Sequence, residues 1–530
     1  MSEIRLSEVS KRFDGRQVLR DIHLRLGEGD KLGLIGRNGV GKTTLLNLIL
    51  GREEPDTGTV DVTEGVTLGY FSQFSELSGT ESILEVLDTL FTDVHAIEKE
   101  QSDLEASLDR TSDESTMTRL LARQATLLDQ MNLVDGWTYQ HRIDTVLTKL
   151  GFPTERRHLP VEQLSGGWRN RAALARILLQ APDVLLMDEP TNYLDLDGLR
   201  WLESWLQQFR GALIVVSHDR HFLDVTVNRI VEIENYHLQA YEGNYTDYVR
   251  KKQLRIKTLE RQFAHEEELL VYEQEGLAER REAAKDPGKT LRRRLANIKK
   301  VATPRPVDAI VTSIYSGLQV SNDLCHVENL TKAYGAQILF EDLSFDIHRG
   351  DRFAVTGPNG SGKTTLIDVL ADAREPDSGR VAWNKGARFV YYNQQLADLD
   401  PDDSVGHAVN AMPDSMAFFA PRKKVNRFLS LFQFSELDLQ QKIRTLSGGQ
   451  RARVALAQCL LSGSAVIILD EPTNHLDITS TQVMERALLH FPGAVVVASH
   501  DRYFIEKVTD RMLAFESDGK VREWASLPPS

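Results

Sequence analysis

Two glycine-rich segments of the chain have the composition and spacing of a loop that wraps around phosphate groups. Gly36–Thr43 reads GRNGVGKT and Gly357–Thr364 reads GPNGSGKT, and a short apolar segment, 31–35 or 352–355, precedes each of them. Glycines allow backbone N–H groups to curl around the β- and γ-phosphates at a helix N-terminus, where anions are favoured. The lysine that follows would neutralise phosphate charge, and the threonine hydroxyl would coordinate Mg²⁺.

One such loop alone has a real rate of chance occurrence, whereas two copies with matched downstream motifs are specific. The residues that we predict to contact the phosphates and Mg²⁺ are Gly36, Asn38, Gly39, Gly41, Lys42, Thr43 and Thr44 in the first copy, and Gly357, Asn359, Gly360, Gly362, Lys363, Thr364 and Thr365 in the second.

Each copy later contains an apolar segment that ends in two carboxylates. The first reads VLLMDE and ends in Asp188 and Glu189; the second reads VIILDE and ends in Asp470 and Glu471. Such runs are typical of buried parallel strands. The aspartates are placed to hold the Mg²⁺ shell, and the glutamates to orient and polarise an attacking water. The alternative, exposed acids without a role at strand ends, fits the repeated context poorly.

The motifs follow one another in the same order in both copies, and their spacing locates an insertion. The lysines of the glycine loops lie 321 residues apart, as do Gln73 and Gln394, whereas Ser165 and Ser447 lie 282 residues apart. The first copy therefore holds 39 additional residues (321 − 282), which fall roughly within 90–135.

The insertion has two apolar stripes at helical spacing with a break at Ser112-Asp113. These stripes consist of Ile97, Leu104 and Leu108, and of Leu120, Leu121, Leu127, Leu128 and Met131. We predict a helical hairpin that projects from the first copy; the alternative is a slightly larger helical subdomain without a partner.

A second unusual segment, 248–306, separates the two copies. Between residues 250 and 305 it carries 16 Lys or Arg against 9 Asp or Glu, although the whole chain has a formal charge of −14. The apolar seam of a first helix consists of Ile256, Leu259, Phe263, Leu270 and Leu277, and this helix ends at Asp286–Gly288. A shorter apolar stripe follows, before Pro304 and Pro306, and consists of Leu291, Leu295, Ile298 and Ala302. We predict an antiparallel hairpin whose first helix spans roughly 50 Å.

The positive charge of this linker is concentrated near its turn. The cations there are Arg280, Arg281, Lys285, Lys289, Arg292, Arg293 and Arg294. Basic helices are often only solvated spacers, but a basic tip on an acidic protein favours a contact with a polyanion.

The composition bounds the class of protein. No run of about 18 apolar residues predicts a membrane helix, and the N-terminus lacks the apolar core of a signal peptide. The chain has two cysteines, Cys325 and Cys459, which are far apart in sequence; this argues against a disulfide framework and fits a cytoplasmic protein. We predict three parts: a first domain at 1–247, the linker at 248–306 and a second domain at 307–530.

The combined motifs resemble those of ATP-binding cassette ATPases. Ser165–Gly167 and Ser447–Gly449 match the signature loop of that family, while His218 and His500 match its switch histidine. The resemblance implies an α/β fold with two P-loop cassettes in tandem, and ATP and Mg²⁺ as ligands. It assigns further residues by position: Gln73 and Gln394 to the Q-loops that contact nucleotide and metal, Asp195 and Asp477 to the D-loops, and Phe13 and Tyr334 to stacking on adenine.

In that family the signature loop of one cassette completes the nucleotide site of the other. The resemblance therefore implies that Lys42, Glu189 and His218 work with Ser447, Gly448 and Gly449, and that Lys363, Glu471 and His500 work with Ser165, Gly166 and Gly167. Neither set lacks a catalytic residue, so both sites should hydrolyse ATP within a monomer.

Within the cassette ATPases the chain is similar to the ABC-F group of translation factors. The shared features are two cassettes in one chain, the insertion in the first, the charged linker and the segments EPTNYLD and EPTNHLD, with Tyr193 and Trp168 as departures. The resemblance implies an ATPase that binds the ribosome in its ATP-closed state near the exit site, with the linker and arm contacting rRNA and tRNA. General translation support and protection from antibiotics both remain open.

Two other hypotheses are the motor subunit of a membrane transporter and a DNA-associated ATPase. The long basic linker has no role in a transporter motor. DNA-repair and chromosome ATPases of this kind usually carry zinc cysteines or very long coiled coils, and the two cysteines here are not clustered. We therefore expect no membrane and no DNA among the partners.

Overall fold

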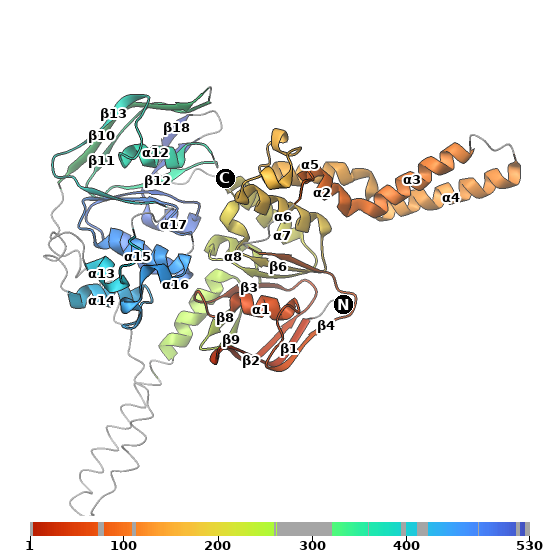
Figure 1. Cartoon of the computed structure of the whole chain (residues 1–530), viewed down its shortest axis with the longest axis horizontal. Helices are drawn as coiled ribbons and strands as arrows, with labels where there is room; N and C mark the ends of the chain where they lie inside the picture. Colours follow the sequence, from red (N-terminus) through yellow and green to blue (C-terminus); the bar gives the residue numbers. More distant parts are fainter. Residues whose placement is uncertain are drawn as a thin grey trace, which may run out of the picture.

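The computed structural model describes most of both cassettes (Figure 1). The described residues are 4–72, 79–108, 113–194, 196–258, 261, 321–335, 337–358, 360–393, 399–410, 422–474, 476–515 and 520–524. Among the residues singled out from the sequence, Gln73, Asp195, Asn359, Gln394 and the linker beyond residue 261 lie outside these ranges.

The first cassette contains two sheets, and its central sheet carries the phosphate-binding loop. A three-stranded antiparallel sheet has the order β2-β1-β4, and a six-stranded sheet has the order β5-β6-β7-β3-β8-β9, in which only β9 runs antiparallel to its neighbour. The strands are β1 (Ile4–Phe13), β2 (Arg16–Leu26), β3 (Lys31–Ile35), β4 (Thr57–Val62), β5 (Leu68–Phe71), β6 (Val184–Asp188), β7 (Ala212–Val216), β8 (Arg229–Glu234) and β9 (His237–Glu242).

Helices cover both faces of the central sheet. They are α1 (Lys42–Ile49), α2 (Ile83–Asp88), α5 (Tyr139–Lys149), α6 (Gly166–Gln180), α7 (Leu196–Gln208) and α8 (Arg220–Thr226). The strand β6 shows why its sequence is apolar throughout. Val184 and Leu186 pack into the core under the three-stranded sheet, whereas Leu185 and Met187 pack against the helical side, so both faces of the strand are buried.

The second cassette repeats this arrangement strand for strand. Its sheets have the orders β11-β10-β13 and β14-β15-β16-β12-β17-β18. The strands are β10 (Asp323–Tyr334), β11 (Gln337–His348), β12 (Arg352–Thr356), β13 (Ser378–Trp383), β14 (Phe389–Tyr392), β15 (Val466–Asp470), β16 (Ala494–Ala498), β17 (Arg511–Phe515) and β18 (Val521–Trp524). The helices are α12 (Lys363–Leu370), α13 (Val405–Asn410), α14 (Arg422–Leu431), α15 (Gly448–Leu461), α16 (Ile478–Leu489) and α17 (Arg502–Val508). The predicted tandem α/β fold is confirmed.

The insertion forms a helical arm that projects from the first cassette (Figure 1). It consists of α3 (Thr92–Leu108) and α4 (Glu114–Leu133), which pack against each other. Asp113 caps α4 by accepting from the backbone N–H of Thr116, and Arg123 of α4 donates through two nitrogens to the carboxylate of Glu100 on α3. The predicted helical hairpin is therefore observed, with its break at the predicted place.

The predicted apolar stripe of the second arm helix is only half right. Leu127 and Met131 are buried, but Leu121 and Leu128 are 50% and 40% exposed. Successive residues on a helix are separated by about 100°, so only one leucine of each adjacent pair can face α3. The arm is a two-helix element, and the face of α4 that carries Leu121 and Leu128 is exposed.

The linker begins as predicted with a helix, which covers residues 245–258 in the described part of the chain. Of the residues assigned to its apolar seam, Ile256 is described and is 44% exposed, while the other members lie outside the described ranges. No helix among the described residues is both long enough and apolar enough to cross a membrane.

The arm supplies a test of local packing. Leu127 is fully buried and the adjacent Leu128 is 40% exposed, so the two make a matched pair. Leu127→Ala should cost about 2–5 kcal/mol, because a buried leucine leaves a cavity, whereas Leu128→Ala should have a small effect. We expect Leu127→Ala to accelerate amide hydrogen exchange in α3 and α4 while ATP turnover is retained. Equal exchange in the two variants would contradict the packing described here.

Candidate active site

The phosphate-binding loops have nearly the same backbone conformation in the two cassettes. Gly39 and Gly41 have φ values of 77° and 110°, and their counterparts Gly360 and Gly362 have 79° and 111°. A side chain is strained at such angles, and a Cβ on Gly41 would also lie 2.6 Å from a methyl carbon of Val18. Glycine adopts these angles without strain, and the glycines therefore maintain the shape of the loop.

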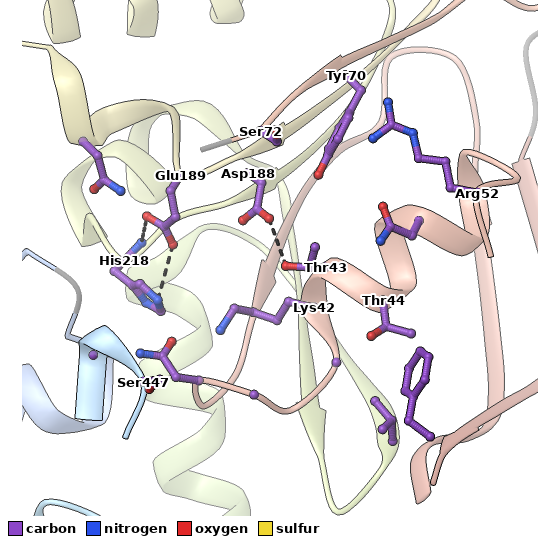
Figure 2. Close-up of a pocket in the computed structure, with 18 of the residues that line it drawn as sticks. Lys42, Thr43, Thr44, Arg52, Tyr70, Ser72, Asp188, Glu189, His218 and Ser447 are labelled. Carbon is purple, nitrogen blue, oxygen red and sulfur yellow. Dashed lines mark hydrogen bonds and ion pairs between the residues drawn. The ribbon is translucent and has the colours of Figure 1, made fainter. Parts of the chain in front are cut away.

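The lysine and threonine at the start of α1 point toward the end of β6 (Figure 2). Lys42 Nζ donates to the carbonyl oxygens of Gly36 and Arg37 at 2.8 and 3.1 Å. The Thr43 hydroxyl donates to Asp188 Oδ2 at 3.0 Å. Burial lowers the pKa of Lys42 and raises the pKa of Asp188, because each charge is partly removed from water.

Glu189 follows Asp188 in a left-handed backbone conformation, with φ 54° and ψ 56°. This conformation places its carboxylate beside His218. Glu189 Oε1 lies 3.3 Å from His218 Nε2, and Oε2 accepts from the His218 backbone N–H at 3.3 Å. Burial raises the pKa of Glu189 to about 8 and lowers the pKa of His218 to about 3, so the imidazole is neutral. A carboxyl group with a raised pKa is a stronger proton acceptor once it is ionised.

The second cassette builds the same constellation. Lys363 Nζ donates to the carbonyl oxygens of Gly357 and Pro358, both at 2.8 Å, and the Thr364 hydroxyl hydrogen-bonds the Asp470 carboxylate. Glu471 has φ 47°, and its Oε1 lies 3.3 Å from His500 Nε2. Burial raises the pKa of Glu471 to about 8.

A cavity of about 710 Å³ occupies the first site and has walls from both cassettes (Figure 2). The residues that line it are Phe13, Val18, Asn38, Gly39, Gly41, Lys42, Thr43, Thr44, Asn47, Arg52, Tyr70, Ser72, Asp188, Glu189, Asn192 and His218 from the first cassette, and Ser447, Gly449 and Thr473 from the second. The backbone N–H of Asn38 also donates to Asp477 Oδ2 of the second cassette at 3.4 Å. The structure thus brings Ser447 opposite Lys42, while the pairing of Ser165 with Lys363 stays a prediction.

The two signature loops differ in how they cap their helices. Ser447 caps α15 in a capping box: its hydroxyl accepts from the Gln450 N–H, and the Gln450 side chain accepts from the Ser447 N–H. Trp168 occupies the equivalent position in α6, and the Ser165 side chain makes no cap hydrogen bond. Because indole has no acceptor, Trp168 cannot form the box.

Trp168 instead packs among aromatic and cationic groups. Its ring lies 4.9 Å from that of Phe152, and the guanidinium groups of Arg156 and Arg171 lie 5.0 and 4.5 Å from its centroid. The departure from the usual glutamine therefore exchanges a helix cap for a cation–π cluster.

The aromatic side chains expected to stack on adenine are both partly exposed. Phe13 lines the cavity and is 40% exposed, and Tyr334 is 47% exposed. Tyr334 accepts a hydrogen bond from Arg374, which also contacts Asp368 at 3.4 Å.

Sequence reasoning missed several cavity residues. Arg52 lies 4.8 Å from the ring centroid of Tyr70, and Asn47 and Asn192 also line the cavity. None of them belongs to a glycine loop or a strand-end acid pair. Asn47 lies four residues, about one helical turn, after Thr43 on α1, and only the helical period of α1 could have indicated it.

The donor set fits a Mg²⁺–ATP complex. Threonine hydroxyls and carboxylate oxygens are the hard ligands that Mg²⁺ takes together with phosphate oxygens. Within the described residues, Asp470 Oδ1 is buried and has no hydrogen-bond partner, so it is available as a ligand. Among the described residues, no group of three or more His, Cys, Asp or Glu side chains is arranged so that it could hold a metal ion by itself.

The chain matches known protein families along both cassettes and the linker. A family described as ABC transporter matches residues 19–192 and 340–474, and a second family with the same description matches residues 231–310. The repeated fold, the glycine loops and these matches define the class as ATP-binding cassette proteins.

Two relatives match nearly the whole chain. The energy-dependent translational throttle protein EttA of Mycobacterium tuberculosis is 33% identical over 97% of this chain and 91% of its own length. The ABC transporter F family member 5 of Arabidopsis thaliana is 32% identical over 99% of this chain and 76% of its own length. The chain belongs to the ABC-F family of ATP-binding cassette proteins, and it is an ATPase.

A solved structure shows the same tandem arrangement. It is the complex of the archaeal ribosomal stalk protein aP1 with the archaeal ribosome recycling factor aABCE1. The match covers 97% of this chain and 89% of the chain in that structure, with a TM-score of 0.64 and 21% sequence identity. At this identity the likeness concerns the fold.

The buried glutamates supply a test of the chemistry. Glu189→Gln combined with Glu471→Gln keeps the side-chain shape and removes the proton acceptor at both sites. ATP should still bind, while turnover should fall by roughly 10²–10⁴-fold. Nucleotide affinity and phosphate release should be measured separately. Phosphate release at the parental rate would show that these carboxylates do not serve the reaction.

The shared cavity supplies a test of composite sites. Ser447→Arg should obstruct the Lys42 site only, because Ser447 lies across from Lys42. In a Glu471→Gln background, where only the Lys42 site turns over, Ser447→Arg should abolish the remaining hydrolysis. In a Glu189→Gln background the same change should leave the remaining rate nearly unaltered. Equal loss in both backgrounds would contradict the assignment.

Proposed function

We propose that Glu189 and Glu471 orient and deprotonate the water that attacks ATP in two composite sites. The observations that support this are the buried carboxylate beside a histidine in each cassette, with a lysine at the neighbouring loop. At the first site Mg²⁺ would be held by Thr43, Asp188 and Gln73, and at the second site by Thr364, Asp470 and Gln394. The ion would supply positive charge to the phosphates.

The roles of the other residues follow from their chemistry. Lys42 and Lys363 would contact phosphate oxygens, as would the loop N–H groups. His218 and His500 would hold the adjacent carboxylate in place. Ser447, Gly448 and Gly449 would close on ATP at the first site, and Ser165, Gly166 and Gly167 at the second. Phe13 and Tyr334 would stack on adenine.

We further propose that the protein binds the ribosome in its ATP-closed state and modulates translation. One observation carries this proposal: a translational throttle protein is 33% identical over 97% of the chain, which includes the segments that form the arm and the linker. The proposed contacts are rRNA and tRNA near the exit site. We propose a cytoplasmic monomer whose three parts are 1–247, 248–306 and 307–530.

The charge and shape of the projecting segments support a contact with RNA. The linker cations listed above would meet RNA phosphates, where recognition depends on shape and charge more than on sequence. The exposed side of α4 presents Met117, Leu121 and Leu128, which are 41%, 50% and 40% exposed, beyond the body of the cassette. Support of general translation and protection from an antibiotic are both compatible with these contacts.

The linker cations allow the partner to be tested. Changing Arg280, Arg281, Arg292, Arg293 and Arg294 to Gln in the Glu189→Gln/Glu471→Gln protein should weaken ribosome co-sedimentation with ATP. The salt dependence should become shallower, by about 0.7–0.9 in the log–log slope for each phosphate contact that is lost. ATPase activity without ribosomes, measured with both glutamates present, should be nearly unchanged.

A matched control removes the same charge elsewhere. Arg5, Arg16, Arg20, Arg25 and Arg380 lie in the antiparallel sheets, and their change to Gln should leave ribosome binding closer to that of the parent. An identical affinity and salt slope for the linker variant and its parent would mean that the linker is a solvated spacer. Association with membranes or DNA in the same assay would favour the transporter or the DNA hypothesis instead.

A further inference from the structure

A buried arginine of the first cassette, two residues after His218, contacts two acids of the second cassette. Arg220 begins α8 and is 4% exposed. Its guanidinium donates to the carboxylate of Glu485 on α16, which is fully buried, and lies 3.5 Å from Asp501 Oδ2. Both acids belong to the second cassette, so this is an ion cluster that spans the cassette interface.

The pseudo-twofold relation between the cassettes predicts a reciprocal contact, and the structure contains it. Arg502 is the residue 282 positions after Arg220, and Glu203 is the residue 282 positions before Glu485. Arg502 Nη1 lies 3.7 Å from Glu203 Oε2 of the first cassette. Each arginine therefore follows its own switch histidine by two residues and pairs with a glutamate of the opposite cassette.

The Arg220–Glu485 contact and the reciprocal Arg502–Glu203 contact differ in strength. Beside Arg220, the ring of Tyr503 lies 5.5 Å away, and the Tyr503 hydroxyl donates to Asp224 of the first cassette at 3.3 Å. Beside Arg502, the equivalent ring is that of His221, whose Nδ1 lies 3.3 Å from the guanidinium. A tyrosine face attracts an arginine, whereas a histidine competes for the same acid, since His221 Nδ1 is also 3.3 Å from Glu203 Oε1.

The cluster is joined to the histidines through short backbone segments. Asp219 and Asp501 each cap the helix that their neighbouring arginine begins, α8 or α17. Both aspartates also line a cavity of about 70 Å³ between the cassettes, together with Glu189, Glu471, His218 and His500. A shift of either arginine would therefore move the segment that carries a switch histidine.

We propose that Arg220 with Glu485 and Asp501, and Arg502 with Glu203, form an interface clasp that couples pairing of the cassettes to the position of His218 and His500. Arg220 and Arg502 are positioning residues in this arrangement, and the Arg220 half is the stronger one. The clasp lies between the two cassettes and acts on their pairing, so it can be tested without the ribosome.

The physical basis is the cost of an unpaired buried charge. When the cassettes separate, water can hydrate every charged side chain of the clasp. When the cassettes are paired and a variant lacks one of these side chains, the charge of its partner stays buried and uncompensated. Loss of one member should therefore act mainly on the rate at which the paired state comes apart.

The test compares Arg220→Met with Lys507→Met. Each variant removes one positive charge and one contact to Glu485. Lys507 Nζ donates to Glu485 Oε2 at 2.8 Å, but both residues belong to the second cassette. In the Glu189→Gln/Glu471→Gln background, Arg220→Met should accelerate the release of bound ATP by about tenfold or more, whereas Lys507→Met should change it by less than about twofold. Equal acceleration by both variants would show that Glu485 needs only local charge balance, and would overturn the clasp.

Further variants keep the inference testable if Arg220→Met folds poorly. Arg502→Met should accelerate release in the same direction but less, because its half is looser. The effects of Arg220→Met and Glu485→Gln should be less than additive in a double-mutant cycle. Unchanged release in Arg502→Met, or additive effects in the cycle, would contradict the proposal.

Discussion

A glutamate in a left-handed backbone conformation at the end of a buried strand is the constraint on which the two sites depend. Glu189 and Glu471 have φ values of 54° and 47°, and a proline follows each of them. Such a conformation costs on the order of 1–3 kcal/mol, and a following proline disfavours it further. The neighbouring strand compensates, because the Glu189 N–H donates to Val216 at 2.9 Å and the Glu471 N–H to Ala498 at 2.8 Å. The central sheet thus fixes where each carboxylate points.

Much of this arrangement could be predicted from sequence, because it is local. The glycine loop, the strand-end acids and the histidine are each defined by a few consecutive residues, and the repeat fixed their register. The arm was predicted from its helical period, but the period alone did not show which of Leu127 and Leu128 faces α3. That choice depends on the partner helix, which the sequence of one helix does not reveal.

The residues that were missed depend on contacts between distant segments. Arg220 and Glu485 are 265 positions apart, and neither belongs to a motif with an evident chemical role. Arg52 and Tyr70 meet only because the segment after α1 and the strand β5 both reach the first site. Trp168 could be noticed as a departure, but its consequence required the capping box of Ser447 for comparison. Tertiary packing, rather than local pattern, determined all of these.

The presence of both cassettes in one polypeptide has a physical consequence for their interface. In a homodimer with twofold symmetry, both copies of a contact must be the same. Here the equivalent positions carry His221 and Tyr503, Trp168 and Gln450, and Phe13 and Tyr334, so each half of the interface has its own chemistry. Fusion also keeps the second cassette at a high effective concentration, so a weak half of the interface need not abolish pairing. A stronger contact can then persist on the Arg220 side while the Arg502 side separates more readily, and the two ATP sites need not open together.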